Sequence, residues 1–316
     1  MTTVIYVTDL YHPFADPDDH FDLAALYALK QIDIKSIIID YAKPHKTPGR
    51  VPIEQLNFIT GRKIPVYPGL KEKLTSPDDT GESQPNSQEG CDAILNCLEK
   101  SDNKVTIISV GSLRDIAAAY NRNAILFENK VDKLIIFIGE SSKQDFFEYN
   151  VRLDKNAFIK VMNNIPNIWW IPCFDGGSWQ NNGNASFWSE HRSVLLKGAS
   201  DPIINYFLYA FTKSTDSINY IPHLYFPVNT EDLQSHILDS SIPLRNLWCS
   251  SVFPYFVEKD KSNFPFTFEQ VSVSVDSNAV LQYTDTGNKV MRFTITDKVN
   301  YSKKMTAIFN KKIRQL

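Results

Sequence analysis

The feature that most constrains the fold is a repeated alternation between short apolar runs and segments with helical periodicity. Runs of this length that end in an acid or a glycine are typical of strands, and the segments between them place apolar residues three and four apart. The expected strands are residues 4–7, 36–39, 105–110, 134–138 and 168–171. The order strand, helix, strand with short connections predicts an α/β fold with a mostly parallel open sheet flanked by helices.

The remaining segments predict additions to this sheet. Residues 202–256 are mostly of helical pattern, which indicates a helical C-terminal part. Three further strands are expected at 270–275, 279–283 and 289–295, with the turn formers of 285–288 closing a hairpin between the last two. Stretches rich in turn formers, 75–90 and 175–185, are expected to be loops. Without a convincing linker, residues 1–316 are expected to form a single domain.

Composition excludes several classes of protein. The 33 Lys plus Arg are balanced by 36 Asp plus Glu, so the basic excess of a nucleic-acid binder is missing. No apolar run approaches the ~18 residues of a membrane span. The N-terminus lacks the pattern of a signal peptide. Four scattered cysteines without a Cys-x-x-Cys pair favour reduced thiols over a zinc site or disulfides, which fits a cytoplasmic protein.

A cluster of acids lies between the first expected strand and the first expected helix. In open α/β sheets, ligands bind beyond the carboxyl ends of the strands, where these acids fall. If the helix begins near Asp18, then Asp18 and Asp22 share one face. Convergent carboxylates repel one another unless a cation lies between them, and ligands that are all oxygen favour Ca²⁺, or alternatively Mg²⁺. The simpler alternative is helix capping, although capping needs only one Asp. The five acids are Asp9, Asp16, Asp18, Asp19 and Asp22.

This segment resembles the N-terminal motif of the nucleoside hydrolases of the inosine–uridine preferring type, Asp-Thr-Asp-Pro-Gly-x-Asp-Asp-Ala-x-Ala-Leu. Asp9 matches the acid at the end of the first strand. Two alignments remain open for the Asp-Asp pair: it corresponds to Asp18 and Asp19, or Asp22 takes its second position. The resemblance implies that Asp9 is the general base or a metal ligand, and that Asp18, Asp19 and Asp22 supply metal ligands.

Three further stretches resemble the family in the same order. Residues 110–117 are similar to its Thr-Gly-Pro-Leu-Thr-Asn-Ile-Ala, which implies that the carbonyl group of Val110 binds the metal. Residues 137–140 stand where the family has Met-Gly-Gly. Residues 148–154 look like its Glu-Phe-Asn-x-x-x-Asp, so that Glu148 and Asn150 would hold ribose hydroxyls. Without the resemblance, a loop at a helix start with Asp154 as the N-cap explains this last stretch.

Two family features are missing. The His-Asp-Pro-x-Ala motif, which carries the last metal ligand, is not found in the C-terminal part. The Gly-Asn that follows the second strand is replaced by Asp40-Tyr41-Ala42-Lys43. These departures bear on metal geometry and activity.

Aromatic and histidine side chains complete the set of candidates. Trp179 lies in the glycine-rich loop 175–185, where its indole could stack on a nucleobase or sugar ring. Trp169 and Trp170 are expected to fill the core. His12 and His20 flank the acidic loop, and either could protonate a leaving base near neutral pH. The favoured interpretation of both is a loop histidine without a catalytic role.

Together these features predict a metal-dependent hydrolase of N-glycosidic bonds in nucleosides or a related ribosyl compound, which would serve nucleoside salvage. The alternatives are a catalytically silent relative that binds a sugar or nucleoside, and a hydrolase of another glycoside. The expected partner is a small-molecule substrate, with neither nucleic acid nor membrane; a homo-oligomer is allowed. A dehydrogenase of the Rossmann type and a serine hydrolase are disfavoured, because Gly-x-Gly-x-x-Gly and Gly-x-Ser-x-Gly are missing.

Overall fold

A computed structural model describes residues 1–40, 49–84 and 87–316. Its strands are β1 (Thr2–Thr8), β2 (Ile32–Ile39), β3 (Val66–Pro68), β4 (Val105–Ser109), β5 (Val131–Phe137), β6 (Ile168–Ile171), β7 (Trp188–Glu190), β8 (Arg245–Leu247), β9 (Phe266–Val275), β10 (Leu281–Tyr283) and β11 (Asn288–Ile295). Its α-helices are α1 (Asp18–Tyr27), α2 (Arg50–Thr60), α3 (Glu89–Lys100), α4 (Arg114–Arg122), α5 (Ala124–Lys130), α6 (Tyr149–Leu153), α7 (Lys155–Asn164), α8 (Arg192–Leu195), α9 (Asp201–Phe211), α10 (Thr230–Leu233) and α11 (Tyr301–Ile313). Short helical turns η1 (Pro222–Tyr225), η2 (Gln234–Leu238) and η3 (Phe253–Phe256) lie between them.

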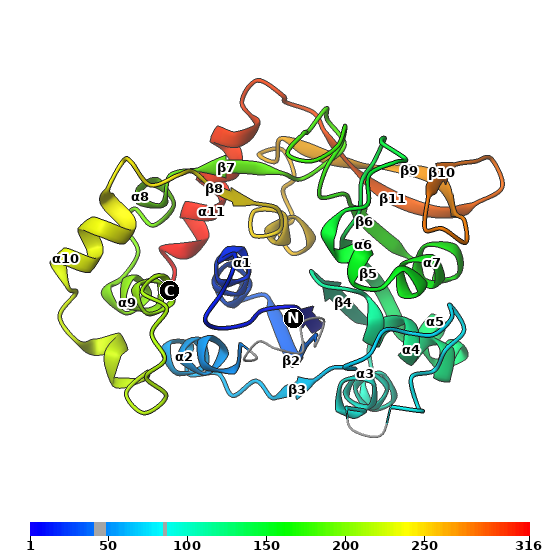
Figure 1. Cartoon of the computed structure of the whole chain (residues 1–316), viewed down its shortest axis with the longest axis horizontal. Coiled ribbons are helices and arrows are strands. Elements are labelled where there is room, and N and C mark those ends of the chain that lie inside the picture. The colour runs from blue at the N-terminus through cyan, green and yellow to red at the C-terminus, as the bar shows by residue number, and fades with distance from the viewer. Residues whose placement is uncertain (41–48, 85–86) are drawn as a thin grey trace.

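The centre of the molecule is a sheet of nine strands in the order β10-β9-β11-β6-β5-β4-β1-β2-β3 (Figure 1). The pairs from β3 across to β11 are all parallel, and only β9 and β10 add antiparallel pairs. The chain runs outward from β1 through β2 to β3, and then returns to β4 on the other side of β1. The strand order therefore reverses between β1 and β4, which is where open α/β sheets open a crevice for ligands.

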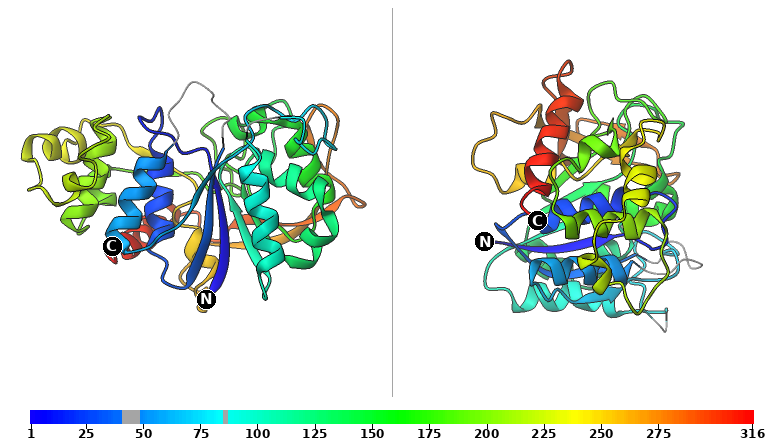
Figure 2. Two further views of the ribbon diagram at one scale, coloured as in Figure 1. Left: turned by 90° about the horizontal axis from the view of Figure 1, so that it is seen from below. Right: turned by 90° about the vertical axis from the view of Figure 1, so that its left-hand side faces the viewer.

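Helices cover both faces of this sheet, which is why its central strands are apolar throughout. In β1, Val4 and Tyr6 pack into one core, whereas Ile5 and Val7 pack into the other. The first core also takes residues from α1, α2, α9 and α11, and the second takes residues from α3, α4, α5 and α7. Figure 2 shows the two groups of helices on opposite sides of the strands. The predicted α/β fold with a mostly parallel sheet, a helical C-terminal part and extra C-terminal strands is confirmed.

Several elements differ from the sequence-based expectation. Helix α2 and strand β3 were not predicted; β3 pairs with β2 and forms an edge of the sheet. Strands β7 and β8 pair in a separate sheet of two strands. The expected hairpin between the last two strands is wrong, because β9 lies between β10 and β11. Tyr283 of β10 and Asn288 of β11 both lie opposite Val273 of β9. Local alternation identifies the strands but not their neighbours.

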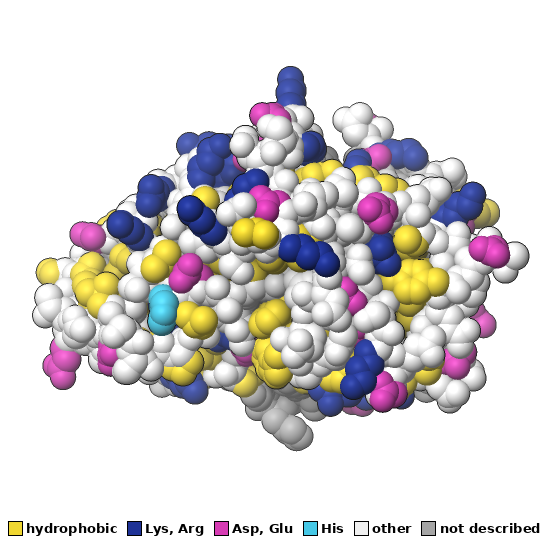
Figure 3. All heavy atoms as spheres, turned by 90° about the horizontal axis from the view of Figure 1, so that it is seen from above, with side chains coloured by type: hydrophobic (Ala, Val, Ile, Leu, Met, Phe, Trp, Pro, Cys, Tyr) yellow, Lys and Arg dark blue, Asp and Glu magenta, His cyan; other side chains and the backbone are white. Residues whose placement is uncertain are grey.

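The surface agrees with the near-neutral composition. On the face drawn in Figure 3, lysine and arginine side chains are interspersed with acidic ones. Within the described residues, no helix combines the length and the apolar character needed to cross a bilayer.

Candidate functional site

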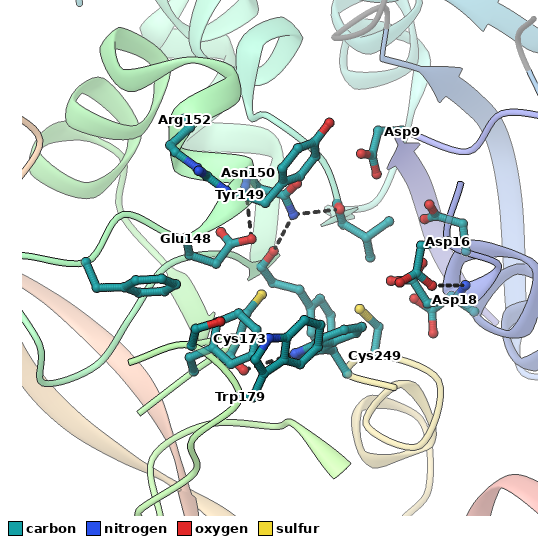
Figure 4. A pocket seen from close by; sticks show the side chains of 18 of the residues that line it. Asp9, Asp16, Asp18, Glu148, Tyr149, Asn150, Arg152, Cys173, Trp179 and Cys249 are labelled. Atoms are coloured by element: carbon teal, nitrogen blue, oxygen red, sulfur yellow. Dashed lines mark hydrogen bonds between the residues drawn. The ribbon is translucent and has the colours of Figure 1, made fainter. Parts of the chain in front are cut away.

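A pocket of about 370 Å³ opens at the carboxyl ends of β1, β4, β5 and β6, beside the reversal of strand order. Small-molecule sites typically have volumes of roughly 300–1,000 Å³. Figure 4 shows Asp9, Asp16 and Asp18 on one side, Glu148, Asn150 and Arg152 across from them, and Trp179 below. The eight residues that were predicted to bind the metal or the substrate all line this pocket: Asp9, Asp18, Asp19, Asp22, Val110, Glu148, Asn150 and Trp179.

The acidic side of the pocket is built by the end of β1 and the first turns of α1. Helix α1 begins at Asp18, so Asp18 and Asp22 lie one turn apart, as expected. The hydroxyl group of Thr8, the last residue of β1, donates a hydrogen bond to Asp19 Oδ1 over 3.0 Å and so joins strand to helix. The N-cap residue of α1 is Pro17, whose side chain forms no hydrogen bond with the helix backbone. Asp16 Oδ1 accepts the N–H of Asp18 over 3.3 Å at this end of the helix, so capping accounts for at most one of the five acids.

The carboxylates destabilise one another's charged forms. Burial, followed by the charges of neighbouring acids, raises the pKa of both Asp18 and Asp19 well above the usual value. Burial also raises the pKa of Asp22 to about 7, even though hydrogen bonds with Cys249 and Ser250 lower it. Asp22 is 1% exposed, and its Oδ1 atom has no hydrogen-bond partner. A cation beside these carboxylates would reduce their mutual repulsion and would give the Oδ1 atom of Asp22 a partner.

The donor chemistry of this side therefore suits a hard divalent cation. Asp9, Asp18, Asp19 and Asp22 would supply carboxylate oxygens, and Val110 would supply its carbonyl oxygen. Over the part of the chain that the structure describes, no group of three or more His, Cys, Asp or Glu side chains is arranged to hold a metal ion.

Glu148 and Asn150 form the opposite, polar side at the start of α6. Glu148 is the N-cap: its Oε1 accepts the N–H of Asn150 over 2.9 Å, and its Oε2 accepts that of Gly139 over 2.9 Å. Burial raises the pKa of Glu148, and these backbone hydrogen bonds lower it. The expected N-cap Asp154 is also present, at the start of α7. Glu148 and Asn150 therefore begin a helix and also line the pocket, so the two interpretations of this stretch are compatible.

The side chain of Asn150 connects the ends of two central strands. Its Nδ2 group donates to the carbonyl oxygen of Val110 over 3.0 Å and to that of Phe137 over 3.4 Å. These bonds fix the amide plane, so that the oxygen Oδ1 is the atom left for a ligand.

The third side of the pocket is aromatic. Trp179 lies 54% exposed, with its ring centre 5.6 Å from that of Phe174, 5.9 Å from that of Phe187 and 6.2 Å from that of Trp248. Trp248 is held by a hydrogen bond from its indole N–H to the carbonyl oxygen of Cys173 over 3.0 Å. We call Phe174, Trp179, Phe187 and Trp248 the aromatic wall. As expected, Trp170 is buried in the core.

Sequence reasoning missed several residues that line the pocket. Arg245 does not line the pocket itself, but it orients the lining residue Asp16 by an ion pair over 3.0 Å. Trp248 and Cys249 come directly after β8, in a segment expected to be mostly helical, so no local signal could have marked them. Other unforeseen lining residues are Tyr11, Phe137, Phe146, Tyr149, Arg152, Cys173, Phe174 and Ser178.

The two histidines near the acidic loop do not line the pocket. His20 is fully buried, and burial lowers its pKa to about 3. The Nε2 atom of His12 lies 2.6 Å from the carbonyl oxygen of Ser214. The favoured interpretation, no catalytic role, agrees with this placement. The interpretation of His20 as a loop residue is wrong, because it lies within α1 and packs against Phe14 and Tyr206.

The remaining sequence-based expectations concern the cysteines and the region after β2. All four cysteines are free, and three are buried, as expected. Asp40 accepts the N–H of Ser112 over 2.8 Å, whereas residues 41–43, which replace the family's Gly-Asn, lie outside the described part. Cys249, which follows β8, hydrogen-bonds to the Asp22 carboxylate.

Comparison with known proteins adds the fold family. No family model matches the chain, and neither does any curated protein. Among solved structures, an inosine–uridine preferring nucleoside hydrolase from Bacillus anthracis matches with a TM-score of 0.60 and 14% identity, covering 100% of both chains. A plant nucleoside hydrolase matches with a TM-score of 0.61 and 15% identity over 99% of both chains. A purine-preferring ribonucleoside hydrolase from Gardnerella vaginalis gives 0.57 and 11%, again over 99% of both. The chain therefore has the fold of the nucleoside hydrolases, in a strongly divergent form.

Proposed function

We propose that this protein hydrolyses the N-glycosidic bond of nucleosides or of a related ribosyl compound. The observation that carries the proposal is the composition of one pocket: acids from the start of α1 lie across from Glu148 and Asn150, with an aromatic wall beside them. The fold shared with the nucleoside hydrolases supports the same chemistry. A ribose needs hydroxyl-binding groups, and a nucleobase needs a flat apolar surface.

Each side of the pocket has a proposed part in the reaction. Asp9 takes a proton from a water molecule, whose oxygen bonds to the anomeric carbon as the bond to the base nitrogen breaks. The base leaves with the electron pair of that bond and takes up a proton from solvent water. Glu148 and Asn150 accept hydrogen bonds from ribose hydroxyls and fix the sugar. Trp179 lies against the base.

A divalent cation, Ca²⁺ or Mg²⁺, belongs to this proposal. Asp9, Asp18, Asp19, Asp22 and the Val110 carbonyl would hold it. When bound, it would supply a positive charge that acidifies water and binds sugar hydroxyls. The buried Oδ1 atom of Asp22 without a partner supports its presence. The four free cysteines support a reducing, cytoplasmic location as part of the same proposal.

The test is release of free base from purine and pyrimidine nucleosides, measured by chromatography with Ca²⁺, with Mg²⁺ and with a chelator. Asp9→Asn is expected to lower the rate of release by about 10²–10⁴, and Asp102→Asn, which removes an exposed acid outside the pocket, is the matched control. Absence of release from every nucleoside under all three conditions would overturn the proposal.

One observation favours a second candidate, a catalytically silent protein that binds a sugar or nucleoside. Among the described side chains no set of ligands is ready for a metal ion. Nucleosides would then raise the unfolding temperature by binding the native state, but no base would be released.

A further inference from the structure

The aromatic wall depends on a loop that is organised around Glu140. This residue lies just after β5 and is 8% exposed. It stands where the resemblance places a glycine. Its carboxylate accepts four backbone N–H groups: Oε1 accepts those of Ser142 (2.8 Å), Lys143 (3.0 Å) and Gly176 (2.8 Å), and Oε2 accepts that of Gly177 (2.9 Å). One side chain thus connects two loops at the mouth of the pocket.

These hydrogen bonds also keep Glu140 charged. Burial raises its pKa, but the backbone N–H groups, with that of Gly176 first, outweigh this and leave the pKa lowered. A charged acceptor makes stronger hydrogen bonds than a neutral one. The carboxylate therefore binds the loop more firmly than a neutral acceptor would.

The loop needs such support because its backbone is unusual. Gly176 and Gly177 have φ angles of 108° and 105°, which other residues rarely adopt. A Cβ atom on Gly176 would come within 2.3 Å of Asn182 Nδ2. Two residues later, Trp179 has a φ angle of 62°, in the left-handed region that is unfavourable for a large side chain. The position of the indole is therefore imposed by the loop.

The C-terminal strands support the loop that begins at Glu140. The hydroxyl group of Tyr283, in β10, donates to the carbonyl oxygen of Ser141 over 2.9 Å. Arg292, in β11, donates to the same hydroxyl oxygen over 3.0 Å. Hydrogen bonds thus connect the added strands to Ser141, and those of the adjacent residue Glu140 continue to the turn before Trp179.

We propose that Glu140 is a positioning residue that holds Trp179 as a fixed flat surface for a planar aromatic ring of the ligand. Trp179 contacts the other three aromatic residues of the wall and leaves over half of its own surface uncovered. The choice of a nucleobase as this ring rests on the proposed function. Glu140 itself lies outside the pocket lining, so it acts on the ligand through Trp179.

The first test needs no ligand. Glu140→Gln keeps one oxygen acceptor but places an amide N–H against a loop N–H, which weakens the turn. Hydrogen exchange of the peptide spanning residues 174–181 is expected to become at least about tenfold faster than in the wild type. Glu190→Gln is the matched control, because Glu190 also accepts a backbone N–H, that of His191, away from the pocket. Unchanged exchange in Glu140→Gln would overturn the proposal.

The second test compares two probes by titration calorimetry: formycin A, an adenosine analogue whose carbon–carbon glycosidic bond resists hydrolysis, and ribose. Trp179→Ala is expected to weaken formycin A binding about tenfold, since stacking on one aromatic side chain has this magnitude. Glu140→Gln is expected to weaken it at least about fivefold and to leave ribose binding within about twofold. In the double variant, Glu140→Gln should add almost nothing to Trp179→Ala.

Two outcomes would overturn the positioning role: an equal loss of both probes in Glu140→Gln, or additive losses in the double variant. Tyr283→Phe provides a milder variant if Glu140→Gln does not fold, with the same expected selectivity for formycin A. Binding of formycin A with these effects but without cleavage of any nucleoside would contradict only the proposed function. If the wild type binds neither probe, the assignment of an aromatic ligand is overturned.

Discussion

The buried carboxylate of Asp22 gives a quantitative prediction about stability. Its pKa is raised by burial from 3.8 to about 7 in the folded protein. Because the folded pKa lies above the unfolded one, Asp22 contributes stability that is fully present below about pH 4 and is lost as the pH rises through about 7. The difference between the two pKa values corresponds to a loss of about 4 kcal/mol in the free energy of unfolding once the pH exceeds the folded pKa.

Replacing Asp22 by Asn removes the charge while keeping the shape. The variant loses part of the hydrogen bonding with Cys249 and Ser250, which costs about 1 kcal/mol. We therefore expect Asp22→Asn to be about 2–3 kcal/mol more stable than the wild type at pH 8, which raises the unfolding temperature of a chain of 316 residues by about 3–5 °C. At pH 4 the gain should vanish.

The assay is thermal and urea unfolding of both proteins at pH 4 and pH 8, with a chelator present throughout. Asp102→Asn serves as the control for removing an exposed acid. The reasoning is refuted if Asp22→Asn is no more stable than the wild type at pH 8. An equal gain at both pH values would refute it as well, because the effect would then not arise from ionisation.

Three further predictions concern the catalytic acid, the cation and the scaffold. Asp9→Asn should lower the rate of base release by about 10²–10⁴, measured as kcat, because a general base contributes this much. Ca²⁺ at about a hundred times its Kd should stabilise the wild type by about 2.7 kcal/mol in a thermal shift assay, and should stabilise Asp22→Asn much less; equal stabilisation would exclude Asp22 as a ligand. Arg114→Met should destabilise the protein by about 3–5 kcal/mol in urea unfolding, because it leaves the buried Asp154 carboxylate, 2.9 Å from the Arg114 Nε atom, without its charged partner.

The strands and the acidic cluster could be predicted because their signals are local. A parallel strand that is buried on both faces is an uninterrupted apolar run, and the residues directly after its carboxyl end lie at the ligand-binding edge of the sheet. Asp9 could be placed from this rule alone, since it comes directly after β1. The role of Val110 needed the resemblance, because the sequence places this residue inside the expected strand 105–110. Glu148 and Asn150 needed the resemblance, because the sequence around them equally describes a helix start.

The parts that could not be predicted depend on contacts between distant segments. Cys249 lies beside Asp22 because β8, which pairs with β7, packs against α1, and nothing near Cys249 in the sequence indicates these contacts. The insertion of β9 between its neighbours is likewise a choice of partner that alternation does not encode. His20 has the polar flanks of a loop residue, yet the aromatic residues that bury it include Tyr206 of α9.

The hydrogen bonds of Asn150 have a consequence for molecular recognition. Both of its N–H groups point at main-chain oxygens of the sheet, so the amide can only accept at its remaining edge. A ligand group that hydrogen-bonds to that oxygen must bring a hydrogen of its own, as an alcohol or an amine does and an ether does not. A ligand in which that alcohol is replaced by hydrogen would leave the amide oxygen unsatisfied, at a cost of about 1–3 kcal/mol. We therefore expect the proposed site to distinguish hydroxylated from deoxygenated compounds because of the way in which the strands anchor this one side chain.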